Sequence, residues 1–309
     1  MKRRDFLRST VAGGVALAAA APLPAEGSMP MRTLGKSGLR VSWFCLGGFH
    51  MAKAGPKNAT SIIHRALGLG VNFFDSAHKY HGGLSDEFYG HALQGGKRKQ
   101  ALLMSKAELR DEDGAMRQLE DTLKRMRTDY LDLWQCHEVA RMDEVEKIFG
   151  PKGSLEAFVK AKKQGKVRHI GFTGHHDPAV HLALLNGFDG WETVQHPLNL
   201  VDPHYLSFTK NVLPKVQQKG LGTIAMKTNA MGPILNNKIA TISECLRFAM
   251  SQGPNTIVSG VETAGQLEEN VAVIKHGKPF GSQELRQLLT RTGRGKLGPQ
   301  IEWYKKKPA

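Results

Sequence analysis

Short apolar runs and amphipathic stretches alternate along the chain after residue 28, eight times in succession. The apolar runs have the length of buried strands, and the stretches between them have the spacing of helices with one apolar face. The predicted strands cover 43–48, 72–76, 101–106, 130–137, 169–174, 193–198, 222–227 and 256–260. The predicted helices cover 58–69, 84–94, 112–126, 154–164, 177–186, 206–219, 240–251 and 264–275.

Eight βα units in about 250 residues predict an α/β protein with a closed (β/α)₈ TIM barrel. A doubly wound open sheet would also alternate, but it usually carries a glycine-rich turn after its first strand. Here Gly47-Gly48 lacks the third glycine and the acidic residue of that motif. Before the first unit, residues 31–42 read as a small β-hairpin around Gly35-Lys36-Ser37-Gly38.

One domain is expected, because no Pro/Ser-rich linker interrupts residues 30–276. We assign the barrel to 29–280. Residues 281–309 contain Gly, Lys and Pro without clear periodicity, and we expect a partly ordered tail over one face of the barrel.

Residues 1–28 read as a twin-arginine export signal. The basic segment Lys2-Arg3-Arg4-Asp5-Phe6-Leu7-Arg8 precedes an apolar stretch that ends before Ala25. This stretch is only about a dozen residues, below the ~20 that span a bilayer, which favours a cleaved signal over a membrane anchor. We therefore expect the twin-arginine machinery as a partner, export to the periplasm or beyond in the folded state, and no stable membrane insertion after processing.

The net charge is +15, or +12 without residues 1–25, which carry four basic side chains and one acidic side chain. Such a surplus could attract nucleic acid, an anionic membrane or an anionic substrate. No RNP-like, zinc-finger or helix-turn-helix pattern focuses it, so we expect general surface charge and no nucleic-acid partner. The cysteines, Cys45, Cys136 and Cys245, are too scattered for a disulfide framework or a four-thiolate metal site.

Four polar residues lie at or just beyond the ends of three consecutive predicted strands. Asp75 ends the second strand and Tyr80 follows it, while Lys106 ends the third and His137 the fourth. Barrel enzymes act at the carboxyl ends of their strands, so these side chains are expected to meet at one side of the barrel mouth.

This set has what protonation of a carbonyl requires. A phenol has an ordinary pKa of about 10, too high for a ready acid–base group at neutral pH. An ammonium ~4 Å away, at an effective dielectric of ~20, would favour the phenolate by about 4 kcal/mol, which is at most ~3 pKa units. Asp75 would keep Lys106 charged, and His137 could donate a hydrogen bond to the substrate oxygen.

Each of these residues also has a simpler interpretation. Asp75 and Lys106 could form a structural ion pair at a barrel rim. Tyr80 could be a rim aromatic, and His137 could be a histidine that is hydrogen-bonded in the interior. The placement of all four together favours an active site.

The segments around these residues resemble the aldo-keto reductases. The resemblance runs in unbroken order over about residues 30–275 and is specific because seven segments occur in sequence. They are 72–80 with 85–87, 105–106, 129–137, 165–172, 195–199, 222–227 and 266–270.

The resemblance implies a barrel closed at its amino end by the hairpin, with NADP or NAD extended across the mouth. Tyr80 would be the general acid, and Lys106 and Asp75 would adjust its pKa. His137 would be the hydrogen-bond donor that orients the substrate. Gln195 would hold the nicotinamide carboxamide, residues 227–232 the pyrophosphate, and Glu269 and Asn270 the adenine. The cofactor-binding positions would be Gly48, Phe49, Thr173, Gln195, Met226, Lys227, Thr228, Gly232, Gln266, Glu269 and Asn270.

The chain departs from the family pattern at two places. Thr173-Gly174-His175-His176 stands where the family often has Ser-Asn, so one carboxamide contact is missing unless a histidine supplies it. Gln266 stands where NADP-preferring members often have an arginine, and an amide cannot match a guanidinium on a 2′-phosphate. His78 and His81 near Asp75 are a weak zinc pattern, and we expect no metal.

The sequence therefore predicts an NAD(P)-dependent oxidoreductase that reduces small aldehydes or ketones to alcohols, or catalyses the reverse reaction. The alternative is a non-catalytic redox sensor of the same fold that binds the nicotinamide nucleotide. A third class, a metal-dependent barrel hydrolase or isomerase, would need a bound metal ion.

Overall fold

The structure, a computed structural model, describes residues 27–294 and 298–305. The predicted export signal, 1–28, lies outside the described residues except for its last two positions. It stays a prediction, as do the periplasmic location and the domain boundary at residue 280.

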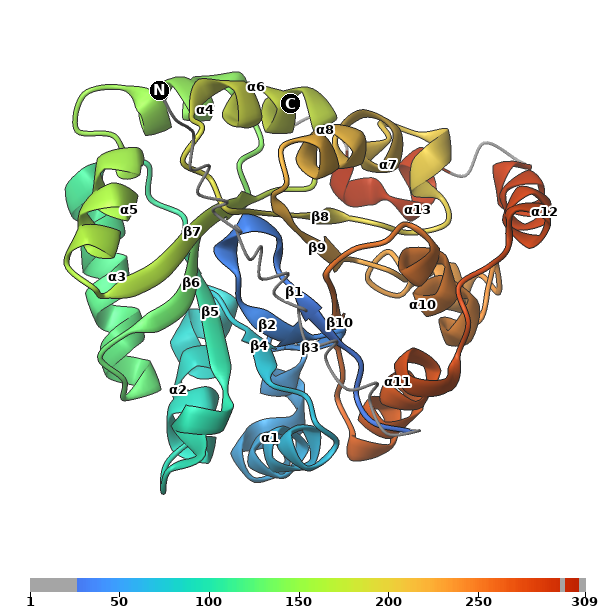
Figure 1. The fold of residues 1–309 in the computed structure, drawn as a ribbon, viewed down its shortest axis with the longest axis horizontal. Coiled ribbons are helices and arrows are strands. Elements are labelled where there is room, and N and C mark those ends of the chain that lie inside the picture. Colours follow the sequence, from blue (N-terminus) through green and yellow to red (C-terminus); the bar gives the residue numbers. More distant parts are fainter. Residues whose placement is uncertain (1–26, 295–297, 306–309) are drawn as a thin grey trace, which may run out of the picture.

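Eight parallel strands close into a barrel in the order β10-β3-β4-β5-β6-β7-β8-β9 (Figure 1). The predicted (β/α)₈ fold is confirmed, and each strand falls within or beside its predicted range. The strands are β3 (Phe44–Gly47), β4 (Phe73–Asp75), β5 (Leu102–Ala107), β6 (Leu131–Cys136), β7 (Val167–Thr173), β8 (Thr193–Pro197), β9 (Gly222–Met226) and β10 (Thr256–Gly260).

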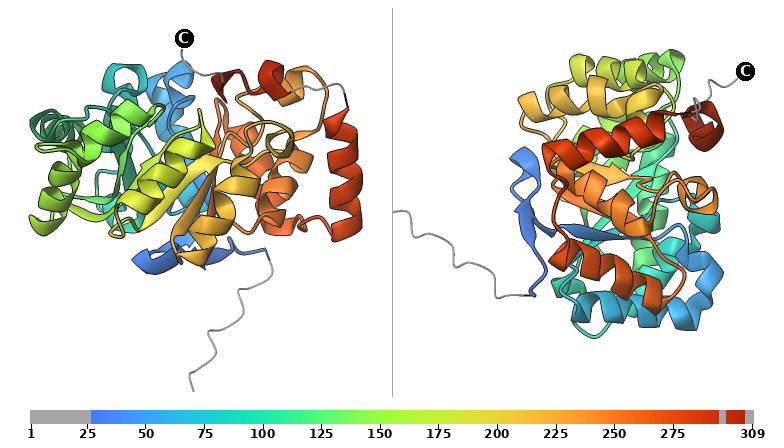
Figure 2. Two further views of the ribbon diagram at one scale, coloured as in Figure 1. Left: turned by 90° about the horizontal axis from the view of Figure 1, so that it is seen from above. Right: turned by 90° about the vertical axis from the view of Figure 1, so that its right-hand side faces the viewer.

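Helices surround the barrel in all three views (Figures 1 and 2). They are α1 (Met51–Gly68), α2 (Leu84–Ala92), α3 (Glu112–Met126), α4 (Met142–Phe149), α5 (Ser154–Lys163), α6 (Pro178–Gly187), α7 (Phe208–Asn211), α8 (Leu213–Gln218), α9 (Pro233–Asn236), α10 (Ile242–Ser251), α11 (Ala264–His276), α12 (Ser282–Gly293) and α13 (Gly298–Ile301). In the described part of the chain, no helix is both long and apolar enough to cross a membrane.

The first helix begins earlier than the sequence predicts. We expected it over 58–69, but α1 starts at Met51 and runs through a kink at Gly55, where φ is +74°. Pro56 follows the kink. A glycine next to a proline is typical of a loop, so the first turns of the helix were not predicted.

The hairpin covers the amino end of the barrel. Its strands β1 (Met31–Thr33) and β2 (Arg40–Ser42) pair antiparallel. Lys36 donates its backbone N–H to the carbonyl of Gly220 at 2.8 Å, just before β9. Asn255, just before β10, donates through Nδ2 to the Thr33 carbonyl at 2.7 Å. The hairpin therefore lies at the end opposite the carboxyl ends of the strands (Figure 2, left).

Apolar side chains are packed on both faces of the barrel strands, as the continuous apolar runs predict. Cys45 on β3 is paired with Phe73 on β4 and Val258 on β10, and all three belong to the interior cluster. On the outside, Trp134 of β6 stacks on Phe158 of α5 with ring centroids 4.0 Å apart. The three cysteines are free and buried.

The end of the chain is fixed to the barrel by a buried cluster of charges. Lys305, in the short 3-10 helix Trp303–Lys305, is wholly buried. Its Nζ lies 2.5 Å from Asp202 Oδ1 and 2.8 Å from Glu302 Oε2. Asn199 donates to the other oxygen of Glu302 at 2.7 Å. This cluster holds Tyr304 beside the barrel mouth.

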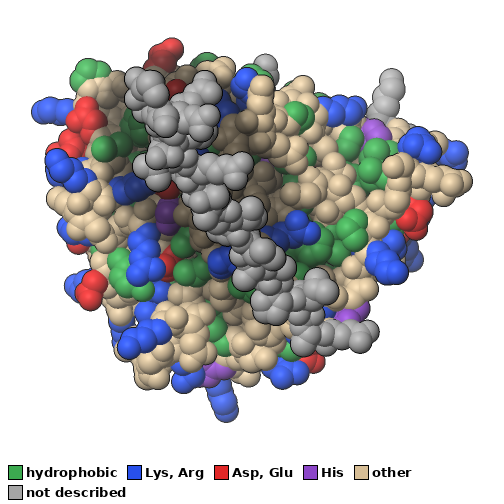
Figure 3. Space-filling model, viewed as in Figure 1, with side chains coloured by type: hydrophobic (Ala, Val, Ile, Leu, Met, Phe, Trp, Pro, Cys, Tyr) green, Lys and Arg blue, Asp and Glu red, His purple; other side chains and the backbone are tan. Residues whose placement is uncertain are grey.

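Basic side chains are spread over the molecule. On the face drawn in Figure 3, Lys and Arg lie at many separate points and do not gather into one patch. This distribution agrees with the prediction of general surface charge.

Candidate active site

A cavity of about 650 Å³ lies at the carboxyl ends of the barrel strands. Asp75, Tyr80, Lys106 and His137 all line it, so the structure brings the four predicted catalytic side chains together. The amino end, by contrast, is covered by the hairpin. The cavity is therefore where a barrel of this type places its chemistry.

The register between β4 and β5 places Asp75 and Lys106 on the same face. Asp75 is opposite Met104, and Lys106 lies two residues further along β5, so both point inward. Lys106 is 1% exposed and its ammonium contacts Asp75 Oδ1. It also donates to the Ser76 carbonyl at 2.6 Å and to the Tyr80 hydroxyl oxygen at 3.3 Å. All three ammonium donors are thus used.

Tyr80 begins the 3-10 helix Tyr80–Gly83 that follows β4. Its ring meets the rings of Phe49 and His137 edge to face, with centroids 5.2 and 5.6 Å away. Because Lys106 donates to the phenol oxygen, the proton of Tyr80 remains available for an acceptor in the cavity.

The protonation of Tyr80 differs from the sequence-based expectation. Burial raises the pKa of Tyr80 to about 12, although Lys106 opposes this increase. Burial alone would lower the pKa of Lys106, but the neighbouring Asp75 and Tyr80 raise it above its ordinary value. The expectation of an easily ionised phenol was therefore wrong, because desolvation of the phenolate outweighs the attraction of the ammonium. The phenol stays protonated, which is the form that a general acid needs.

This pKa predicts a flat pH profile. We expect the rate of carbonyl reduction to show no loss from ionisation of Tyr80 below about pH 10, because a group with a raised pKa keeps its proton there. The loss should begin only as the pH rises toward the pKa of about 12. Measurement of kcat against pH at saturating cofactor checks this. A falling limb centred below about pH 9 would contradict it.

His137 is held in its neutral form. Burial, with Lys106 nearby, lowers the pKa of His137 well below its ordinary value. The backbone N–H of His137 donates to the Ala107 carbonyl at 2.8 Å, and its Nδ1 is buried without a hydrogen-bond partner among the described residues. A neutral imidazole can still donate one N–H to an oxygen in the cavity.

Ten of the eleven predicted cofactor-binding residues line the same cavity, and the exception is Gly48. Gly48 donates its backbone N–H to the Asp75 carbonyl at 2.8 Å. A methyl group placed on it would lie 2.1 Å from Ser85 Oγ, so Gly48 belongs to the packing around the site. The ten lining residues are Phe49, Thr173, Gln195, Met226, Lys227, Thr228, Gly232, Gln266, Glu269 and Asn270.

Two features of the cavity fit a nicotinamide dinucleotide. Gln195 is 1% exposed, and its Oε1 has no hydrogen-bond partner among the described residues. Buried polar atoms normally have a partner, and the N–H₂ of a carboxamide could be the one for this oxygen. Along the loop after β9, Lys227, Ala230 and Met231 have positive φ, and so does Gly232. Turns of this kind point successive N–H groups toward an anion. Lys227 lines the same cavity, with its ammonium 3.1 Å from Met231 Sδ, and burial lowers its pKa to about 8.

The packing around Gly174 matches the departure from the family pattern after β7. A methyl group on Gly174 would lie 2.5 Å from the Val139 carbonyl oxygen and 2.8 Å from His181 Cε1. The asparagine of the family pattern therefore has no room at this position. Thr173 lies on the cavity side, and its carbonyl accepts the N–H of Val139 at 3.0 Å.

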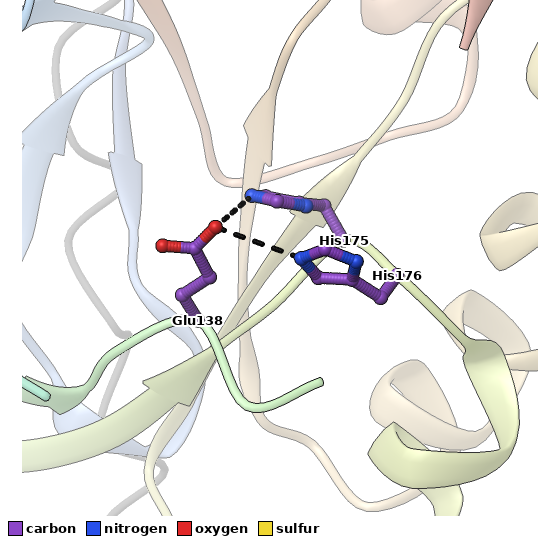
Figure 4. A group of neighbouring side chains, drawn as sticks. All are labelled: Glu138, His175 and His176. Carbon is purple, nitrogen blue, oxygen red and sulfur yellow. Dashed lines mark ion pairs between the residues drawn. The ribbon is translucent and has the colours of Figure 1, made fainter. Parts of the chain in front are cut away.

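A further group of polar side chains lines the cavity beside His137, and the sequence analysis did not foresee it. Glu138 points toward His175 and His176 from the neighbouring loop (Figure 4). Its Oε1 lies 3.2 Å from His175 Nε2 and 3.6 Å from His176 Nε2, and Lys79 contacts its Oε2. The contact with His175 lowers the pKa of Glu138 well below its ordinary value. Burial lowers the pKa of His175 to about 4.

The histidines that flank Tyr80 do not form the weak zinc pattern considered above. His78 Nε2 lies 3.6 Å from Asp121, and His81 Nε2 lies 2.7 Å from the Phe49 carbonyl. Asp75 is bonded to Lys106 instead. The three side chains therefore have separate partners.

Comparison with known proteins agrees with the barrel fold. Residues 44–242 match the model of the Aldo/keto reductase family. The chain belongs to this family.

Individual relatives of this aldo-keto reductase are distant. It is 32% identical over 224 residues to the uncharacterized oxidoreductase YrpG of Bacillus subtilis, covering 64% of this chain and 66% of that protein. It is 25% identical to the L-galactose dehydrogenase of Arabidopsis thaliana, and the match covers 82% of this chain and 91% of that protein. The solved structure of an aldo-keto reductase from Klebsiella pneumoniae in complex with NADPH superposes with a TM-score of 0.68 at 21% identity. The superposition covers 86% of this chain and 95% of that chain. Among eight of the curated relatives that this chain matches, the matched part spans from 46% to 91% of the relative's length.

Proposed function

We propose that this protein is an NAD(P)-dependent oxidoreductase that reduces aldehydes or ketones to alcohols, or catalyses the reverse reaction. The observation that carries the proposal is the Tyr80 hydroxyl, which is held in the cavity by the Lys106 ammonium at 3.3 Å. Asp75 in turn contacts that ammonium.

Other residues of the cavity would hold the cofactor. Gln195 and Thr173 would bind the carboxamide of the nicotinamide, and the loop from Lys227 to Gly232 would bind the pyrophosphate. Glu269 and Asn270 would meet the adenine. The unpartnered Oε1 of Gln195 and the left-handed residues of the loop support these roles. When bound, the cofactor supplies a hydride to the carbonyl carbon.

The side chains around the carbonyl oxygen would complete the reaction. As negative charge develops on that oxygen, His137 donates a hydrogen bond to it and Tyr80 gives up its proton. Lys106 then stabilises the phenolate that remains, and Asp75 keeps the ammonium in position. In the oxidation direction the same proton returns to Tyr80.

The comparisons support the same class of reaction. The named relatives include an oxidoreductase and an L-galactose dehydrogenase, and the Klebsiella pneumoniae structure contains NADPH. These names favour a nicotinamide cofactor and a small carbonyl or alcohol substrate for this chain.

A two-step assay tests the proposal against the sensor alternative. NADPH and NADH are first titrated into the protein and binding is followed by cofactor fluorescence. Consumption of the bound cofactor is then followed with a panel of small aldehydes. We expect binding and aldehyde-dependent consumption. Tight binding without consumption would favour the sensor, and no binding of either nucleotide would contradict both.

Cofactor preference gives a further prediction. Gln266 lines the cavity, and its Oε1 accepts the backbone N–H of Glu262 at 2.8 Å. Changing Gln266→Arg should increase the affinity for NADPH relative to NADH by about tenfold, because a hydrogen bond to a charged group contributes ~1.5–3 kcal/mol. The ratio of the two Kd values measures this. Gln100→Arg adds the same charge at an exposed position elsewhere and should leave the ratio unchanged.

A further inference from the structure

The cluster of Glu138, His175 and His176 is not used by the reaction proposed above. Glu138 follows β6, and the two histidines follow the adjacent strand β7. The Val139 N–H donates to the Thr173 carbonyl at 3.0 Å and fixes the two loops relative to each other. Glu138 itself has a φ of +50°, a strained conformation for a residue with a side chain. The backbone is thus held in the arrangement that aims the carboxylate at both imidazoles (Figure 4).

We propose that Glu138, His175 and His176 bind a divalent transition-metal ion at the wall of the cavity, with Zn²⁺ as the representative ion. Two imidazoles and one carboxylate are a ligand set suited to zinc or ferrous ions. One ring nitrogen of each histidine and one carboxylate oxygen all lie within 4.8 Å of one another.

The distances are compatible with coordination of one ion by all three side chains. Ligand atoms 2.0–2.2 Å from a tetrahedral zinc ion lie roughly 3.4 Å from one another. The observed separations from Glu138 Oε1 are 3.2 Å to His175 Nε2 and 3.6 Å to His176 Nε2. At 3.6 Å the His176 contact is longer than a well-formed hydrogen bond, so a bridging ion could bring this ring and the carboxylate into direct bonds that they do not make with each other.

Charged and aromatic side chains surround the three proposed ligands, among them the ammonium groups of Lys79 and Lys227. Lys79 contacts the second oxygen of Glu138 and would orient the carboxylate from outside the coordination sphere. The same ammonium lies 3.7 Å from Glu108, so two carboxylates share one lysine. The ring of Tyr304, from the end of the chain, packs edge to face on His175 with centroids 5.4 Å apart and supports it from the other side.

The site would be open on its cavity side. Glu138, His175 and His176 all line the cavity that also contains Tyr80 and His137. Three protein ligands leave a tetrahedral ion one free position, which an oxygen of solvent or of a bound molecule would fill. The sequence did not predict this site because its ligands come from two different loops.

Zinc binding by the purified full chain tests the proposal. Protein without an affinity tag is stripped with a chelator and dialysed against Zn²⁺ without nucleotide, and bound zinc is counted by elemental analysis. We expect one equivalent per chain in the parent, and binding weakened by about tenfold or more in Glu138→Gln and in His176→Ala. His276→Gln removes an exposed imidazole on α11 and should bind as the parent does.

Absence of stoichiometric zinc in the parent would overturn the proposal, and so would parent-like binding by Glu138→Gln and His176→Ala. Circular dichroism shows whether each variant is folded, and titration with NADPH separates failure of the metal site from failure of the cofactor site. If neither variant folds, an anomalous-scattering map of zinc-soaked parent crystals decides. The expected peak lies between Glu138 Oε1 and the two Nε2 atoms, and a peak only elsewhere would overturn the proposal.

Discussion

Replacement of Tyr80 by phenylalanine is expected to lower kcat for carbonyl reduction by about 100- to 10,000-fold, the contribution typical of a positioned general acid. The change removes one hydroxyl, the group to which Lys106 donates at 3.3 Å. The ring and its edge-to-face contacts with Phe49 and His137 would remain. Cofactor binding should therefore change little. Single-turnover kinetics with pre-bound NAD(P)H measure the chemical step directly.

Tyr130→Phe is the matched control for this experiment. Tyr130 lies just before β6, far along the strand from the cavity, and its ring is stacked against the guanidinium groups of Arg98 and Arg168. Loss of this hydroxyl should leave kcat within about twofold of the parent, since the residue lies outside the proposed proton-transfer set. If Tyr80→Phe were as active as Tyr130→Phe, another group would have to supply the proton.

The largest effect on stability is expected for Lys305→Met. The change removes the ammonium that lies between Asp202 and Glu302 and leaves two carboxylates buried without a cation. Breaking a buried ion pair from one side costs about 3–5 kcal/mol in the free energy of unfolding. Urea unfolding followed by circular dichroism measures the loss. Because Lys305 adjoins Tyr304 at the cavity, we also expect KM for the carbonyl substrate to rise.

Lys210→Met makes the same chemical change at an exposed position of α7 and should alter the free energy of unfolding by less than about 0.5 kcal/mol. The double variant Lys305→Met with Glu302→Gln should recover part of the loss, because it removes one of the two uncompensated carboxylates. Equal stability of Lys305→Met and Lys210→Met would show that the end of the chain is not held by this cluster.

The barrel could be predicted from the sequence because its strands are buried on both faces. In β6, Leu133 points into the barrel and Trp134 points out to the helices. A continuous apolar run of this length is typical of a parallel strand that helices cover on one side. Glycines also directly follow three of the predicted helices, 58–69, 154–164 and 206–219. Gly70, Gly165 and Gly220 all have positive φ in the structure, as helix-terminating glycines do.

Helix α4 was missed because the prediction allowed one helix for each strand. The local signals were present. Glu144 accepts the backbone N–H of Arg141, as in a helix cap. Val145 and Ile148 form a buried apolar face. The contacts that dock the expected tail could not be predicted, for a different reason. Its docking depends on Lys305 meeting Asp202, about a hundred residues earlier, and no local pattern encodes such a contact.

The proposed catalytic set was accessible from the sequence because strand ends of a barrel converge, so that Asp75, Lys106 and His137 could be placed together before any coordinates existed. The protonation state of Tyr80 could not be predicted from the sequence. The pKa of Tyr80 depends on how completely the surroundings exclude water, and that is a property of the packed cavity. The meeting of Glu138 with the histidines after β7 depends likewise on loop geometry.

Transfer of a labelled hydride tests the central claim most directly. The protein is incubated with nicotinamide cofactor that carries deuterium at the transferable position of the reduced ring, together with a small aldehyde, and the alcohol is analysed by mass spectrometry. The proposed reaction places one deuterium on the former carbonyl carbon for each cofactor oxidised, and we expect product formation to be suppressed in Tyr80→Phe. An unlabelled alcohol, or no alcohol with any aldehyde despite bound cofactor, would contradict it.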